Sequence, residues 1–233
     1  MQKRKLLVFL AVWKRPEITE ICFLGLNRLR KHPDYDINVL AVISEESMIP
    51  LCEKYDVNWV MHENLPLGRK KNYGLKESLR FDWEYLIEIG SDDILKDEFL
   101  SLYPFDRDVL TLHDFIQIDT RTNECRRQTC RHAYFGAGRS ISRKAIERVK
   151  ELWNDYLNEG LDNFSTARLS RYGFMEKRIK SSEPVIVSLK GSVNIWPFRS
   201  VGIEYPIENA LQGLSEEELN AIACLNQSLE LAS

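Results

Sequence analysis

The sequence has little of what marks several classes of protein. Its 233 residues include only five cysteines, an odd number. They are widely spread along the chain: Cys22, Cys52, Cys125, Cys130 and Cys224. A chain of this length does not need disulfides in order to fold. We therefore expect reduced cysteines and a cytoplasmic protein.

An excess of basic residues is also missing. Lys and Arg number 32 against 35 Asp and Glu, which gives a formal net charge of −3. This balance argues against a nucleic-acid binder. Hydrophobic residues make up 44% of the chain and charged residues 29%. These fractions allow a buried core and exclude global disorder.

Long apolar runs are scarce as well. Residues 1–13 place basic residues before an apolar run, as a signal peptide does, but Lys14, Arg15 and Pro16 follow without a cleavage site of small residues. No other run approaches the length that would span a bilayer. The sequence thus predicts no transmembrane segment, and it leaves a peripheral membrane contact open.

Within the first hundred residues, apolar runs of strand length alternate with segments of helical periodicity. Strands are expected at 6–13, 37–43, 57–61 and 85–89, and helices from Pro16, at 49–55 and at 68–79. Such alternation is typical of βαβ units and a mainly parallel sheet. No repeat or Gly/Ser/Pro-rich linker interrupts the chain. The sequence therefore predicts one α/β domain over residues 1–233.

The pattern changes after residue 100. Residues 109–118, a turn at 119–123 and further strand beyond it predict an antiparallel hairpin. One helix is expected over 142–160, with Ser142 as its N-cap and Gly160 as its stop. A last helix is expected over 215–231, where Ser215 and Glu218 have the spacing of a capping box.

Asp92 and Asp93 are the first candidates for chemistry. They follow the strand at 85–89, at the sheet edge where open parallel sheets bind ligands. Two adjacent carboxylates suit Mn²⁺ or Mg²⁺, which take oxygen ligands and share the phosphates of a substrate. The alternative is a solvated loop, or a cap for a helix starting near Leu95, and the dipeptide by itself favours that alternative.

Five motifs in chain order, spread over residues 6–174, resemble those of family 2-like inverting glycosyltransferases. They are Trp13-Lys14-Arg15-Pro16-Glu17, Gly68-x-x-x-Asn72-x-Gly74, Asp92-Asp93, Gly136-Ala137-Gly138 with Arg143, and Leu161-Asp162-Asn163 with Arg168, Leu169 and Gly173. The resemblance implies the GT-A fold, which has a Rossmann-like, mainly parallel sheet flanked by helices. An antiparallel hairpin insertion and a C-terminal helix would complete it.

The resemblance also implies an activity: metal-dependent transfer of a sugar, with inversion, from a nucleotide-diphosphate sugar to a hydroxyl of a glycan, a lipid-linked or another acceptor. Asp162 would be the catalytic base, Asp93 the metal ligand, and Asp92 would face a metal-bound water or the ribose. The donor would also contact Trp13, Arg15, Gly68 and Asn72. Residues 1–100 would bind the nucleotide, residues 101–200 the acceptor, and residues 201–233 would form a helical tail.

Three positions depart from the family pattern. Glu45 stands where the family has a base-reading Asp, so the nucleobase stays open. Gly90 takes the place of the first Asp of the longer metal motif, and Leu161 replaces a Glu. A non-catalytic nucleotide- or carbohydrate-binding protein of this fold is thus one alternative. A sugar-nucleotide nucleotidyltransferase is another, although the Gly-rich loop expected after its first strand is missing.

Clusters of basic residues leave further alternatives open. Arg126 or Arg127 could hold a diphosphate or an acidic acceptor, or could form a solvated hairpin edge. Lys71 is assigned to phosphate, although a solvated first turn is expected for at least two residues of 69–71. Residues 190–198 are either a loop that closes over the donor or a packed segment.

Overall fold

The computed structural model describes residues 3–129, 135–191 and 198–230. Its strands are β1 (Arg4–Ala11), β2 (Tyr35–Ile43), β3 (Asn58–Met61), β4 (Tyr85–Gly90), β5 (Asp93–Leu95), β6 (Val109–Leu112), β7 (Asp114–Asp119), β8 (Cys125–Thr129), β9 (Arg139–Ser142), β10 (Lys177–Ile179), β11 (Ile186–Lys190) and β12 (Ile203–Glu204). Its helices are α1 (Pro16–Leu29), α2 (Ile49–Lys54), α3 (Leu67–Ser78), α4 (Glu98–Leu102), α5 (Arg143–Val149), α6 (Leu161–Arg171), α7 (Ile207–Leu211) and α8 (Glu216–Glu230), with a 3₁₀ turn η1 (Glu46–Met48).

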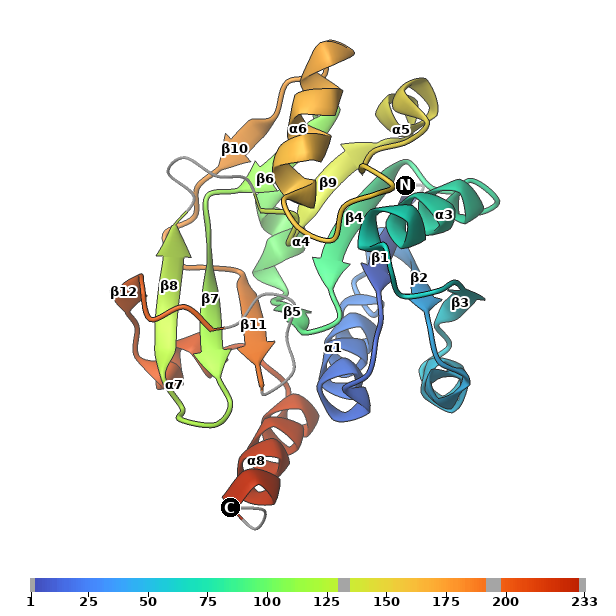
Figure 1. Cartoon of the computed structure of the whole chain (residues 1–233). Helices are drawn as coiled ribbons and strands as arrows, with labels where there is room; N and C mark the ends of the chain where they lie inside the picture. Colours follow the sequence, from blue (N-terminus) through green and yellow to red (C-terminus); the bar gives the residue numbers. More distant parts are fainter. Residues whose placement is uncertain (1–2, 130–134, 192–197, 231–233) are drawn as a thin grey trace.

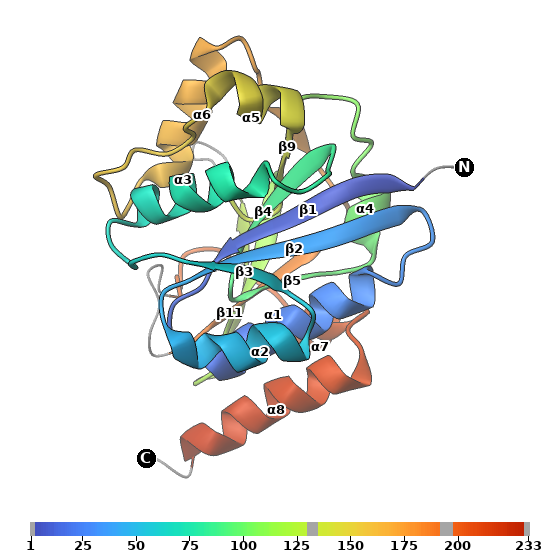
Figure 2. The same cartoon turned by 90° about the vertical axis from the view of Figure 1, so that its right-hand side faces the viewer.

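A seven-stranded sheet forms the centre of the molecule, in the order β10-β6-β9-β4-β1-β2-β3. The strand β1 pairs in parallel with β2 and β4, and β2 pairs in parallel with β3. Helix α3 covers one face of these strands, and α1 and α2 cover the other (Figure 2). The expected α/β class with a mainly parallel sheet is confirmed.

The continuous apolar run of β1 is explained by burial on both faces of the sheet. Leu6, Val8 and Leu10 belong to the cluster that packs against α1, while Leu7 and Phe9 belong to the cluster on the side of α3. All five side chains are inaccessible or nearly so.

A second sheet of five strands, in the order β12-β8-β7-β11-β5, lies beside the first (Figure 1). The expected hairpin is β7 paired antiparallel with β8. The expectation of one strand over 109–118 is wrong, because the chain changes sheets at His113. Its N–H donates to Ile179 O at 2.9 Å, after which β7 pairs with β8 and β11. Every residue of β6 and β7 is buried, and the sequence over 109–118 has no glycine or proline that would mark the break.

The single helix expected over 142–160 is also wrong. Ser142 caps α5 by accepting a hydrogen bond from Ala145 N, as expected, but α5 ends at Val149. Lys150 follows with a left-handed φ of 65°. Gly160, expected as the stop, is instead the left-handed N-cap of α6. Leu152 and Trp153 are buried without being helical, because their partners lie on α3 and β1, whereas Tyr156 is exposed.

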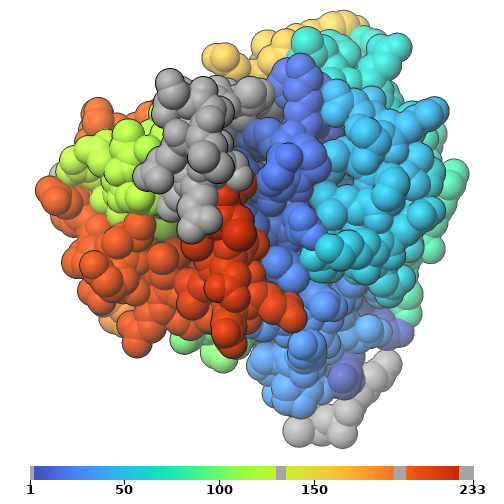
Figure 3. Space-filling view, turned by 90° about the horizontal axis from the view of Figure 1, so that it is seen from below, coloured from blue at the N-terminus to red at the C-terminus, as the bar shows by residue number. Residues whose placement is uncertain are grey.

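The C-terminal helix α8 packs against α1, and its expected capping box is present. Ser215 N–H donates to Glu218 Oε2 at 2.7 Å, and Glu218 N–H donates to Ser215 Oγ at 3.3 Å. Glu218 is fully buried and accepts from Arg28 of α1 at 2.9 Å. Gly25 permits this approach, because a Cβ there would lie 2.9 Å from Glu218 Oε1. Figure 3 shows the C-terminal segment in red against the blue N-terminal one.

The described residues include most of the cysteines. Cys22, Cys52, Cys125 and Cys224 carry free thiols, while Cys130 lies outside the described residues. Over residues 3–129, 135–191 and 198–230, no helix combines the length and apolarity needed to cross a membrane.

Candidate functional site

A cavity of about 280 Å³ opens between the two sheets. It is lined by the carboxyl end of β4, the loop that leads into β5, the last residues of β11 and the start of α6. Asp92, Asp93 and Asp162, the three carboxylates singled out from sequence, all line it together with Arg15 and Lys71. Residues from the first and the last of the five sequence motifs therefore line the same cavity.

Asp92 is held by two basic side chains. Lys190 Nζ lies 2.7 Å from Asp92 Oδ2, and Arg15 Nη1 lies 3.4 Å from the same oxygen. Burial alone would raise the pKa of Asp92, but the charges of Lys190 and Arg15 outweigh burial and lower this pKa below its ordinary value. Asp92 is therefore a stable anion inside the cavity.

Asp93 is the first residue of β5 and accepts hydrogen bonds on both carboxylate oxygens. Ser188 Oγ donates to Oδ1 at 2.6 Å, and Gly90 N–H donates to Oδ2 at 2.6 Å. Burial, followed by the charge of Asp92, raises the pKa of Asp93. The pair is thus no solvated loop and no helix cap, because both side chains are buried where the chain passes from the first sheet to the second.

Asp162 lies in the first turn of α6 and faces the same cavity from the opposite side of the site. Burial and then the negative charge of Glu88 raise its pKa, while Lys71, Arg139 and a hydrogen bond from the backbone of Gly136 act in the other direction. Gly136 is needed for this approach, because a Cβ there would lie 2.7 Å from Asp162 Oδ1 and 2.9 Å from Glu88 Oε1. A buried carboxylate with a raised pKa suits a general base.

Glu88 is the centre of an ion-pair network beneath Asp162. It pairs with Lys71 of α3 and with Arg139 of β9, whose Nη2 lies 2.7 Å from Glu88 Oε2. Burial would raise the pKa of Glu88, but the charges of Lys71 and Arg139 lower it. Lys71 also lies 4.2 Å from the centroid of the Trp153 ring. Lys71 therefore lines the cavity and is at the same time ion-paired with Glu88.

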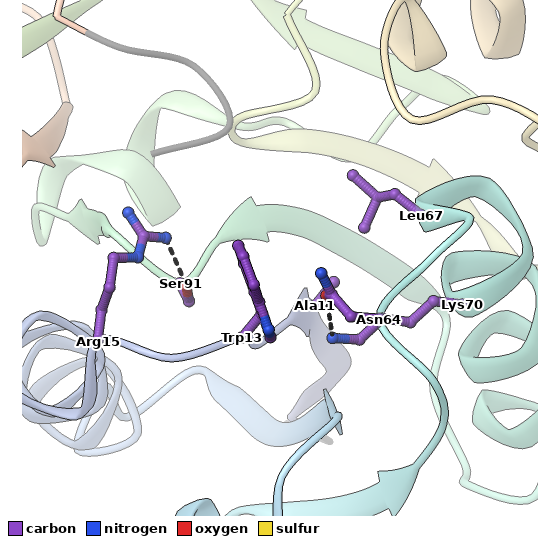
Figure 4. A pocket seen from close by; sticks show the side chains of 7 residues that line it. All are labelled: Ala11, Trp13, Arg15, Asn64, Leu67, Lys70 and Ser91. Atoms are coloured by element: carbon purple, nitrogen blue, oxygen red, sulfur yellow. Dashed lines mark hydrogen bonds between the residues drawn. The ribbon is translucent and has the colours of Figure 1, made fainter. Parts of the chain in front are cut away.

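A smaller pocket adjoins the cavity beside the end of β1 (Figure 4). Trp13 and Arg15 line it, and Arg15 Nη2 donates to Ser91 Oγ at 3.1 Å. Lys70 forms its inner wall and is fully buried, with Nζ 2.5 Å from Val12 O and 3.3 Å from Asn64 Oδ1. Burial lowers the pKa of Lys70 to about 7. Within residues 69–71 only Arg69 is exposed, so the expected solvated turn is wrong for the other two.

The loop before α1 has an unusual backbone. Lys14 and Arg15 are both left-handed, with φ of 55° and 57°. Lys14 N–H donates to Glu45 Oε2 at 3.2 Å, which brings the loop after β2 beside the loop after β1. Left-handed conformations of non-glycine residues carry strain that neighbouring contacts must offset, and they gather at functional sites. Here the turn directs the Arg15 guanidinium back toward Ser91 and Asp92.

Gly68 and Asn72 hold the segment that follows α5. A Cβ on Gly68 would lie 1.8 Å from Asn154 O, so no larger residue fits there. The Asn72 side chain is buried, accepts from the N–H groups of Leu152 and Trp153 and donates to Trp153 O. Neither residue lines the cavity. Their motif is explained within the described residues by packing between α3 and residues 150–160.

Arg127 lies on β8, away from the lining of the cavity. Its Nε and Nη2 donate to Asp114 Oδ2 at 2.9 and 2.5 Å. Arg126 pairs with Glu124 and Glu204. Arg126 and Arg127 thus have acidic partners on their own sheet or beside it. This arrangement favours a structural role at the hairpin edge over a role in binding a diphosphate.

Among the charged residues of the site, the sequence patterns give no site role to Lys190, Glu88 or Arg139. In the sequence, Lys190 is only the start of the segment 190–198, of which residues 192–197 lie outside the described residues. Glu88 sits inside an apolar strand pattern, where a single acidic residue is a usable signal for a buried ion pair. Arg139 has no comparable local signal, because its partners come from β4 and from the segment after α6.

The expected metal fits these residues poorly. Across the described part of the chain, no three His, Cys, Asp or Glu side chains are grouped to hold a metal ion. Asp92 Oδ2 already faces two cationic groups, and both oxygens of Asp93 accept hydrogen bonds from the protein. A divalent cation on Asp92 Oδ2 would have to displace Lys190 or share that oxygen with it.

Comparisons with known proteins identify the fold. No protein-family model matches the sequence, and no curated protein matches it in sequence. Among solved structures, TarS 1–349 of S. aureus is 13% identical with a TM-score of 0.59, and the match covers 79% of this chain but only 60% of the solved TarS chain. The mannosyltransferase PcManGT of Pyrobaculum calidifontis, solved with GDP-Man and Mn²⁺, is 12% identical with a TM-score of 0.54 over 99% of this chain and 76% of its own.

The chain has the GT-A fold. Drosophila β1,4-galactosyltransferase 7, solved with xylobiose, is a further neighbour at 15% identity and a TM-score of 0.52, covering 78% of this chain and 67% of its own. The inositol-1-phosphate CTP transferase of T. maritima is similar too, at 12% identity and a TM-score of 0.51, covering 98% of each chain. In GT-A terms, the main cavity lies at the carboxyl ends of the parallel strands, the edge at which such sheets bind ligands.

Proposed function

We propose that this protein transfers a sugar from a nucleotide-diphosphate sugar to a hydroxyl group of an acceptor. The observation that carries the proposal is the arrangement of one cavity. Its donor end has Arg15, Lys190 and Asp92, and its other side has Asp162, a buried carboxylate with a raised pKa. The GT-A neighbours that are glycosyltransferases support the same assignment.

In the proposed reaction Asp162 accepts the proton of the acceptor hydroxyl. The acceptor oxygen attacks the anomeric carbon, and the bond to the diphosphate breaks on the opposite side. A single displacement of this kind inverts the anomeric configuration. The raised pKa of Asp162 makes its carboxylate a stronger base toward that proton.

The two pockets suggest how the donor lies. Trp13 offers a flat ring, and the buried Lys70 a polar group, for a nucleobase in the smaller pocket. Glu45 is close enough to the loop of Lys14 to contribute to the choice of base. We further propose that residues 1–100 carry most of the nucleotide, that residues 101–200, apart from Lys190, carry the acceptor, and that the tail 201–233 has a structural task.

Mn²⁺ or Mg²⁺ was expected from the sequence, and two GT-A neighbours were solved with manganese. Those neighbours support a divalent cation in proteins of this fold. The carboxylates of this chain argue against a bound cation, because Asp92 and Asp93 already accept hydrogen bonds from protein groups. The proposed reaction therefore contains no step at a metal.

Asp162→Asn tests the proposal. Asn keeps an oxygen for the Gly136 N–H but cannot take a proton, so transfer should fall by about 10²–10⁴-fold while nucleotide binding persists. Transfer would be measured as nucleotide-diphosphate release from UDP-, GDP-, CDP- and dTDP-sugars with a panel of saccharide and lipid-linked acceptors. Asp106→Asn, an exposed carboxylate paired with Lys177, is the matched control. Unchanged transfer in Asp162→Asn would contradict the assignment.

Nucleotidyl transfer is the second candidate, and the T. maritima neighbour favours it. Pyrophosphate release from a nucleoside triphosphate in the presence of a phosphorylated substrate would reveal that activity. A binding protein without turnover would instead be stabilised by a nucleotide diphosphate and would neither transfer nor hydrolyse any donor of the panel.

A further inference from the structure

Lys190 has a fixed place at the donor end of the cavity. It is the last residue of β11, and β11 pairs antiparallel with β5 so that Ser188 stands opposite Asp93. Leu189 N–H donates to Asp92 O at 2.8 Å. This register sets the Lys190 side chain against the Asp92 carboxylate, with Nζ 2.7 Å from Oδ2 and only 6% of the residue exposed.

The carboxylates around Lys190 have little capacity left for a metal ion. Three of the four oxygens of Asp92 and Asp93 already accept from protein donors: Lys190 and Arg15 on one, Ser188 on the second, and the Gly90 backbone on the third. A divalent cation on Asp92 Oδ2 would lie next to an ammonium group and a guanidinium group. Like charges at such separations repel strongly in a buried site.

The same groups are well suited to an anion. An ammonium group is a compact charge that binds phosphate oxygens, and a guanidinium group donates several parallel hydrogen bonds. Asp92 holds both groups in place through its Oδ2 oxygen. The donor end therefore already contains the positive charge that a leaving diphosphate requires.

We infer that Lys190, with Arg15 beside it, binds the donor diphosphate and neutralises it in place of a divalent cation. The inference rests on the proposed function. As the bond between the anomeric carbon and the diphosphate oxygen breaks, the electron pair stays on that oxygen, where the Lys190 ammonium group stabilises it. The acceptor proton goes to Asp162. Asp92 is then a positioning residue for Lys190 and Arg15 and holds no metal.

Nucleotide binding without metal is the first test. Thermal unfolding of the whole protein would be followed with UDP, GDP, CDP and dTDP, each in excess EDTA and each with Mn²⁺. At least one nucleotide should raise the melting temperature in EDTA, and Mn²⁺ should add nothing. A shift that needs Mn²⁺ would overturn the role of Lys190 and leave the proposed function standing. No shift in either condition would contradict the proposed function itself.

Lys190→Met is the second test. It should weaken nucleotide binding in EDTA by about tenfold or more, because a charged hydrogen bond to phosphate is lost. Lys190→Arg should restore part of the affinity. The matched control is Lys96→Met, which removes an equally buried lysine that bonds Asn209 O outside the cavity. Unchanged affinity in Lys190→Met would overturn the inference.

Mn²⁺ alone is the probe of the third test, which does not depend on turnover or on full stability of the variant. Electron paramagnetic resonance of free Mn²⁺ should show no binding to the wild-type protein. Lys190→Met should bind Mn²⁺ measurably, because Asp92 Oδ2 loses its main cationic partner. Mn²⁺ bound to the wild-type protein with the affinity of the variant would overturn the inference.

Discussion

Two buried carboxylates, Glu88 and Asp162, both lie next to Gly136 and have opposite pKa shifts. Glu88 has two cationic partners in direct contact, Lys71 and Arg139, which lower its pKa despite burial. Asp162 feels the same cations without pairing with either one, and burial together with the Glu88 charge raises its pKa. Contact with the cations therefore decides which carboxylate is the structural anion and which is suited to accept a proton.

Glu88→Gln tests this division of roles through the pH profile. Removing the negative charge leaves Lys71 and Arg139 beside Asp162, so the pKa of Asp162 should fall. The acidic limb of the transfer rate, which reports protonation of the base, should then move to lower pH. The measurement is the rate against pH for both proteins, with Glu147→Gln, an exposed carboxylate, as control. An acidic limb that stays in place would show that Glu88 does not act on Asp162.

The same variant should lose stability in a pH-dependent way. A carboxylate whose pKa is lowered on folding stabilises the protein above its ordinary value, here 4.5, and this contribution is lost as the pH falls through the lowered pKa. Glu88→Gln should therefore cost about 1–3 kcal/mol at neutral pH. The difference in melting temperature from wild type should shrink below pH 4.5.

The segment between α5 and α6 gets its shape from α3. Sequence periodicity predicted a helix there, because Leu152 and Trp153 continue the apolar spacing of α5. Asn72 takes their N–H groups as hydrogen-bond donors, which replaces the bonds that a helix would supply. Figure 1 shows the resulting path from α5 past α3 to α6. This path ends at Gly160, the N-cap of α6, so it also sets the position of Asp162 in the first turn of that helix.

Asn72→Ala should destabilise the protein by about 2–4 kcal/mol, because it leaves the buried N–H groups of Leu152 and Trp153 without an acceptor. Transfer should fall with stability, since residues 150–160 lead into the Asp162 turn. Unfolding in urea measures the loss. Asn58→Ala on the edge strand β3 removes one bond to Val39 O at an exposed residue and should cost much less. Equal losses in the two variants would mean that Asn72 does not hold the segment.

On the scale of the whole molecule, α1 joins three parts of the structure. It covers one face of the first sheet, its Ile18 and Ile21 belong to the apolar cluster under the second sheet, and its Arg28 binds α8. Arg28 donates to Glu218, to Asp97 and to the backbone of Leu95. The C-terminal helix is thus tied to the chain that positions Arg15 and Asp93.

Glu218→Ala should lower the free energy of unfolding by about 1.5–3 kcal/mol, because Arg28 loses its buried partner and keeps only the more exposed Asp97. Glu217→Ala, one residue earlier and exposed, should change it by less than about 0.5 kcal/mol. Denaturant unfolding of both variants checks the prediction. A loss confined to α8, with the rest of the chain unfolding as in wild type, would show that the helix is an independent appendage.

The sequence alone determined the alternation of strands and helices in the first hundred residues, the caps of α5 and α8 and the position of Asp92-Asp93 at a sheet edge. These features depend on neighbours within a few residues, so local spacing carries them. Motif order also pointed to the GT-A fold and to Asp162. The roles assigned to the individual site residues stay predictions.

Only the tertiary structure decided which charges meet. Lys190 reaches Asp92 because β11 pairs with β5, and the two residues are 98 positions apart in the chain. The end of β6 before His113 also depends on distant partners. So do the hydrogen bonds that Asn72 accepts from Leu152 and Trp153. Pairing between remote strands and burial of remote side chains depend on the whole packing arrangement, and no local pattern records it.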